Sequence, residues 1–77
     1  MIDIKESKMD VILKELAGRK NEIQKEVDIL FKANMKITDW DVPEADDKQA
    51  AELILKIIEE RLSKIRSDIV AGKYDYY

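Results

Sequence analysis

Acidic side chains near the middle of the chain are the first candidates for chemistry. They are Asp39, Asp41, Glu44, Asp46 and Asp47. Oxygen-rich loops of this kind can hold calcium or magnesium. A calcium loop starting at Asp39 would need an oxygen donor at Pro43 and a glutamate at Ala50, and neither is present. We therefore expect these acids to complement the dipole of a following helix, and we predict no metal site.

The remaining acids lack the spacing of a helical magnesium site. Glu22 and Glu26 are four residues apart beside an apolar stripe, whereas Glu59 and Glu60 are adjacent and would point in different directions round a helix. The chain has no histidine and no cysteine. The usual general base and thiol nucleophile are therefore missing, and no glycine-rich loop could cradle a phosphate. We expect no enzymatic activity and no cofactor.

The first half of the chain carries a heptad pattern typical of a helix that faces one neighbour. One series is Met9, Leu16, Ile23, Leu30 and Ile37, and the interleaved series is Leu13, Lys20, Val27 and Asn34. The pattern predicts a helix from about residue 4 to 36. A glycine at 18 and a possible cap at Asn21 leave a three-helix alternative open, but the heptad crosses this segment without a change of phase and favours one continuous helix.

The second half repeats the pattern with Ala51, Leu55, Ile58, Leu62, Ile65 and Ile69. Pro43 could be a first helical residue, and Asp46 followed by Gln49 forms a capping-box sequence. Gly72 marks the stop, since glycine suits a helix C-cap. These signals predict a connection at 37–43, a helix over about 44–71 and a short tail at 72–77. The fold class is then all-α: a single domain over 1–77, built as an antiparallel two-helix hairpin.

A chain of 77 residues is short for a stable core, and without cysteine it has no disulfide to add. We therefore expect a homo-oligomer, in first place a dimer that forms a four-helix bundle. The apolar face is widest near the connection, which places Phe31, Ile54, Ile57 and Ile58 at the contact between copies. Lys20 and Asn34 occupy inward heptad positions, where a polar residue specifies register; alternatively, Lys20 extends its stem along apolar surface and Asn34 caps the first helix.

Four aromatic residues remain as candidates for binding a partner: Trp40, Tyr74, Tyr76 and Tyr77. Tyrosine suits interfaces because it combines apolar area with a hydrogen-bonding tip. The alternatives are that Trp40 covers the end of the bundle and that the tyrosines belong to a disordered terminus.

Charged residues make up 40% of the chain, with both signs interleaved and a net charge of −3. No apolar run is long enough to span a bilayer, and the N-terminus lacks the pattern of a signal peptide. We expect a cytoplasmic protein-interaction module, an adaptor or regulator of the kind that phages and mobile elements encode, with itself and an unidentified protein as partners. The alternative is a nucleic-acid-binding hairpin dimer similar to Rop, but the isoelectric point near 4.9 argues against nucleic acid as a partner.

Overall fold

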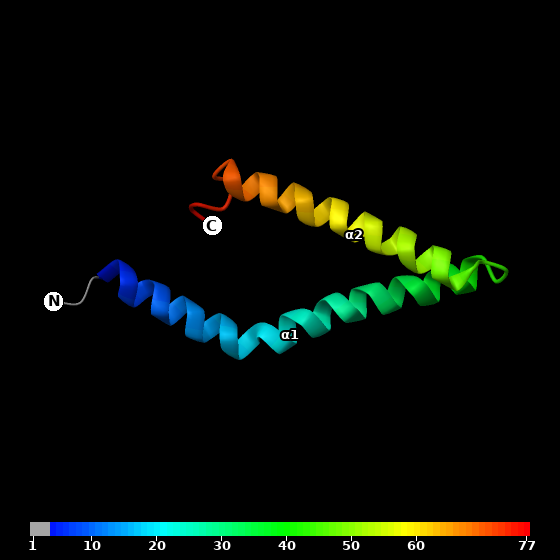
Figure 1. Ribbon diagram of the computed structural model, residues 1–77, viewed down its shortest axis with the longest axis horizontal. Coiled ribbons are helices and arrows are strands. Elements are labelled where there is room, and N and C mark those ends of the chain that lie inside the picture. The colour runs from blue at the N-terminus through cyan, green and yellow to red at the C-terminus, as the bar shows by residue number, and fades with distance from the viewer. Residues whose placement is uncertain (1–3) are drawn as a thin grey trace. The chain divides into compact units, whose positions relative to one another are not determined.

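The computed structural model describes residues 4–77, with side chains from Lys8 onward, and this part of the chain is helical without strands. Helix α1 comprises Ile4–Asp41 and helix α2 comprises Asp47–Val70 (Figure 1). The chain divides into two compact units at Leu30 and Phe31. We call residues 4–30 the N-terminal segment and residues 31–77 the hairpin unit, and each is described by itself.

Helix α1 passes Gly18 and Asn21 without interruption, so the continuous helix is confirmed and the three-helix alternative is wrong. A methyl group added at Gly18 would meet no atom within 4 Å. The glycine therefore sits on an open side of the helix, where it weakens helix propensity but relieves no steric conflict.

The end predicted for α1 at residue 36 is wrong, because the helix continues to Asp41. The Thr38 hydroxyl donates to the Asn34 carbonyl at 2.9 Å, and the Val42 amide donates to the Thr38 carbonyl at 2.8 Å. The helical bonding thus continues up to Val42, the residue that Pro43 restricts. Asp39 and Trp40 consequently belong to the helix, beyond the last heptad position at Ile37.

Helix α2 begins three residues later than predicted, but Asp46 is its N-cap as expected. The Asp46 carboxylate accepts the Lys48 amide at 3.1 Å. Pro43 lies in the connection instead of opening the helix, because the Ala45 amide already bonds the Val42 carbonyl at 2.9 Å in a turn. The true connection is therefore residues 42–46.

The C-terminal stop at Gly72 is confirmed. Gly72 has φ +82°, its amide bonds the Ile69 carbonyl at 3.0 Å, and the Lys73 amide bonds the Asp68 carbonyl at 2.9 Å. This pair of bonds is a Schellman motif, which needs a left-handed residue after the C-cap Ala71.

The hairpin unit joins the end of α1 to α2, and its small core lies between these segments. Ala50 is the one buried hydrophobic residue among the described residues, with 7% of its surface exposed. The half-buried residues on α1 recur at helical spacing, as do the apolar half-buried residues on α2: Phe31, Asn34, Met35 and Thr38 on α1, and Ala51, Ile54 and Ile58 on α2. The all-helical hairpin is therefore confirmed.

Candidate interaction surfaces

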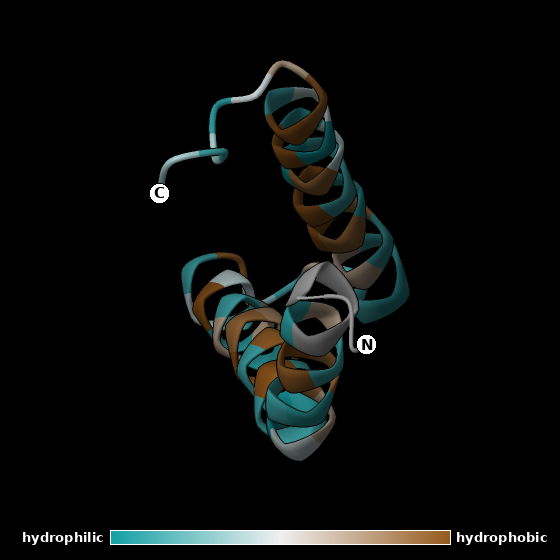
Figure 2. Cartoon of the chain, turned by 90° about the vertical axis from the view of Figure 1, so that its left-hand side faces the viewer, coloured by the Kyte–Doolittle hydropathy of each residue, from teal (hydrophilic) through white to brown (hydrophobic). Residues whose placement is uncertain are grey.

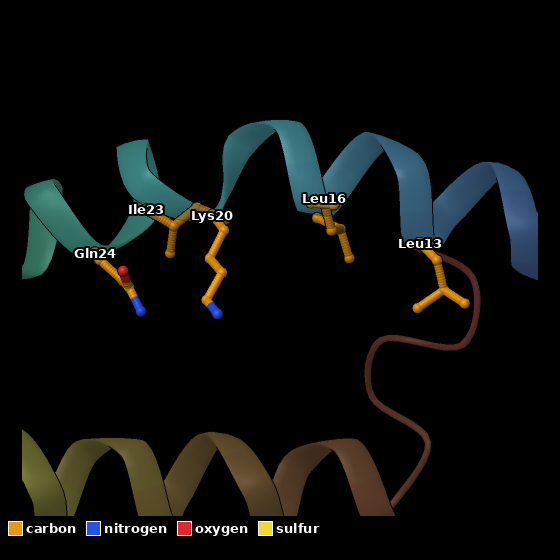
Figure 3. Close-up of a pocket in the computed structure, with 6 residues that line it drawn as sticks. Leu13, Leu16, Lys20, Ile23 and Gln24 are labelled. Atoms are coloured by element: carbon orange, nitrogen blue, oxygen red, sulfur yellow. The ribbon is translucent and has the colours of Figure 1, made fainter.

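The N-terminal segment presents the predicted heptad stripe on its surface. Leu13, Leu16, Lys20 and Ile23 project from the same side of α1, together with Gln24 (Figure 3). They border a shallow hollow along the helix that Ala17 completes. The apolar members of the stripe from Met9 to Val27 are between 40% and 59% exposed. Brown apolar positions recur along the helices in Figure 2, between teal hydrophilic ones. The stripe is therefore a continuous apolar surface with one lysine in its middle.

Charged residues border this stripe. Arg19 precedes Lys20 and lies 3.9 Å from the Glu22 carboxylate in an exposed ion pair one turn along the helix. Glu26 precedes Val27, the next residue of the same heptad series. An exposed ion pair of this length is worth only about 0–1 kcal/mol, so Arg19 can exchange its partner at little cost.

The hairpin unit partly covers the residues that we predicted at the contact between copies. Phe31, Ile54 and Ile58 are half-buried within the chain, whereas Ile57 is 66% exposed. The heptad pattern indicated the width of the apolar face but not how the hairpin divides it. The role of these four residues in an interface between copies stays a prediction.

The aromatic candidates lie at opposite ends of the hairpin unit. Trp40 is 86% exposed on the last turn of α1 and borders a shallow hollow with Lys36, Ile37 and Asp41. Beyond Gly72, the Tyr74 and Tyr77 rings meet edge to face with centroids 5.7 Å apart, while Tyr76 is fully exposed. The two groups therefore present aromatic surface separately, and the role of each in binding a partner stays a prediction.

Two carboxylates in the hairpin unit have displaced pKa values, in opposite directions. A hydrogen bond with the neighbouring Asp47 raises the pKa of Asp39, and the charge of Asp47 acts in the same direction. At the other end of α2, the hydrogen bond that Lys64 Nζ donates to Asp68 lowers the pKa of Asp68, and Lys73, 3.7 Å from its other oxygen, acts in the same sense. The helix ends that flank the connection therefore carry a repulsive pair at neutral pH, and the C-terminal end of α2 carries an attractive cluster.

Comparisons with known protein families, curated protein sequences and solved structures find no significant match to this chain. Among the described residues, no group of three or more acidic, histidine or cysteine side chains is arranged to hold a metal ion. No helix in the described range is long and apolar enough to cross a membrane.

Proposed function

We propose that this chain is a cytoplasmic protein-interaction module that works as a homodimer and binds a protein partner, as an adaptor or regulator without catalytic activity. The observation that carries the proposal is the exposure of the stripe on α1. Large exposed apolar patches mark interaction sites in soluble proteins. A stripe repeated over several heptads is also the pattern by which helices pair.

A dimer would supply the core that one chain lacks. Burial of apolar surface stabilises a fold by about 25 cal/mol per Å², and Ala50 alone is buried in the described part of the chain. Helices in water depend mainly on tertiary packing of their apolar face, so an exposed stripe leaves α1 marginal. Pairing of two hairpins into a four-helix bundle with coiled-coil packing would cover both helices, including Ile57 on α2.

The aromatic ends are the proposed sites for the second partner. Tyrosine and tryptophan are enriched at protein interfaces, and Trp40 and Tyr76 are highly exposed at their respective ends of the hairpin unit. Small helical regulators encoded by phages or other mobile elements share this plan, which is an analogy of architecture alone.

Sedimentation equilibrium of the full chain tests the first half of the proposal. We expect a dimer at tens of micromolar, with helicity and melting temperature that rise with concentration. A monomer whose thermal transition is cooperative and independent of concentration would contradict it. Binding of RNA with strong salt dependence would instead favour the Rop-like alternative.

A further inference from the structure

Charged residues beside the stripe of the N-terminal segment form a pattern that favours one kind of binding partner. Leu13, Lys20 and Val27 form one series of the stripe, and the residue before each of them borders one side of it: Ile12, Arg19 and Glu26. We call these three the flanking row. In a pair of coiled helices, residues that flank the apolar seam set the choice of partner and its orientation. This row is positive at Arg19 and negative at Glu26, one heptad later.

We infer that the N-terminal segments of two copies pair antiparallel through this stripe, in the register that places Lys20 of each copy opposite Ile23 of the other. The inference rests on the proposed homodimer and specifies its interface. In this register Leu16 packs against Val27 of the second copy, so the apolar series remain in contact on both sides of the centre.

The flanking row explains why a second copy fits. In an antiparallel pair, this row faces the same row of the other copy. The register above places Arg19 opposite Glu26 of the second copy and, by symmetry, Glu26 opposite the second Arg19. Two complementary contacts therefore form per dimer. Lys20 borders the same side, where its flexible stem can carry the ammonium group out to the Glu26 carboxylate of the other copy.

Other arrangements of the same helices lose this complementarity. A shift by one heptad in one direction places Arg19 opposite Arg19, and the opposite shift places Glu26 opposite Glu26. A parallel pair places Lys20 against Lys20 inside the apolar seam, and it brings Arg19 beside the uncharged Gln24. Like charges in contact oppose association. The antiparallel register is consequently the one that the charges favour.

Within the hairpin unit, the half-buried positions of α1 only partly coincide with the two heptad series. In the hairpin unit, Phe31 and Thr38 are half-buried. Each comes directly after a position of the heptad series that runs from Met9 to Ile37, and Ile37 itself is 55% exposed. Asn34 of the interleaved series is half-buried, whereas Ile37 of the other series stays exposed.

Charge exchange with measurement of the dissociation constant tests the register. Arg19→Glu and Glu26→Arg each convert two attractive contacts into two repulsive ones, so we expect each variant to associate roughly tenfold more weakly than the native chain. A mixture of the two variants forms pairs in which both contacts join opposite charges, and these mixed pairs should be tighter than either variant alone. Lys25→Glu is the control, because it makes a similar change of charge on the outer face.

The results distinguish the inference from the proposed function, with helicity followed by circular dichroism in each sample. In the mixed pair, the Arg19→Glu substitution of one copy faces the Glu26→Arg substitution of the other, and the native Glu26 faces the native Arg19. The two exchanges can also be combined in a double variant of a single chain. That double variant, with both exchanges, again places opposite charges at both contacts and should regain native affinity. Weak single variants, a restored double variant and an unaffected control support the antiparallel register.

Other outcomes overturn the register or the dimer itself. A dimer that ignores Arg19→Glu and Glu26→Arg, or a double variant that stays weak, would overturn the register while the homodimer stands. A loss in the control equal to that in Arg19→Glu would also overturn it, since net charge alone would then explain the loss. A native chain that stays monomeric at hundreds of micromolar would overturn both.

Discussion

The N-terminal segment and the hairpin unit carry similar apolar repeats, but the residues of these repeats differ in how far they are buried. In the hairpin unit, the end of α1 and α2 provide neighbours for each other, and Ala50 becomes buried. In the N-terminal segment, Leu16 and Ile23 project from the same side of α1 (Figure 3) and are 46% and 40% exposed. A repeat therefore specifies which face of a helix needs a neighbour, whereas the neighbour itself comes from elsewhere. We propose that it is within the chain for one unit and in a second copy for the other.

The largest expected effect separates the stripe from the opposite side of the same segment. Leu16→Asp would bury two unpaired carboxylates per dimer at a cost of about 1–3 kcal/mol each, so we expect association to weaken by roughly 100-fold. Val11→Asp makes a comparable change at an exposed position off the stripe and should leave the dissociation constant nearly unchanged. Analytical ultracentrifugation measures both, and equal losses in the two variants would mean that the stripe is not the interface.

The second prediction concerns packing inside the hairpin unit. Ala50→Leu would overfill the contact at the one buried alanine of the described residues and should lower the free energy of unfolding by about 1–3 kcal/mol. Ala71→Leu places the same side chain at an exposed position at the other end of α2 and serves as the control. Denaturant unfolding of both variants at a fixed protein concentration gives the difference. Equal stability of the Ala50→Leu and Ala71→Leu variants would show that the two helices are not closely packed at Ala50.

The two glycines should respond to alanine with opposite signs. Gly18→Ala fills open space on a regular helix and should stabilise it by about 1 kcal/mol. Gly72→Ala forces a left-handed backbone on a residue with a side chain and puts the new carbon 2.9 Å from the Asp75 carboxylate, so we expect a loss of about 1–2 kcal/mol. Thermal unfolding followed by circular dichroism measures both changes, and a gain in stability at residue 72 would contradict the cap geometry.

The smallest effects are those of pH on the two ends of the hairpin unit. The raised pKa of Asp39 means that the fold favours its protonated form, so its ionisation beside Asp47 lowers stability at neutral pH. Asp39→Asn should therefore raise the melting temperature at pH 7, with a gain that shrinks below about pH 4. The pKa of Asp68 is lowered. Its contribution to the stability of the fold is therefore present above the ordinary pKa of 3.8 and is lost as the pH falls through the pKa of the folded state.

Asp68→Asn is the matching test and should lower the melting temperature at pH 7, with a deficit that disappears in strong acid. Melting temperatures of both variants across the range from strong acid to neutral pH decide the signs. The same direction of change at neutral pH for the two variants would contradict the assignment of a repulsive pair at the connection and an attractive cluster with Lys64.

Local signals in the sequence predicted local structure well. They did not predict which apolar residues the packing of the two helices would cover. The cap at Asp46 could be predicted because its carboxylate accepts a nearby backbone amide. The stop at Gly72 could be predicted because a residue without a side chain leaves the backbone free to turn and close the cap hydrogen bonds. The end of α1 was misplaced because the heptad ends at Ile37 while the helix continues to Asp41, so the loss of an apolar repeat does not by itself mark the end of a helix. The heptad correctly set Ile58 apart from the exposed Ile57, but it could not tell that Ile54 would be half-buried while Leu55 stays 49% exposed.

The most direct test of self-association through α1 is a distance between copies. The chain has no cysteine, so a spin label can be attached at one chosen position, Val11→Cys or Asn21→Cys. In the antiparallel register, the two labels at position 21 lie almost level, whereas the two labels at position 11 are separated by about 32 Å along the helix axis. Pulsed electron resonance on the dimer should therefore give a much longer distance for the Val11→Cys variant than for Asn21→Cys. Short distances of similar length at both positions would contradict the account, since they would mean that the two helices run parallel.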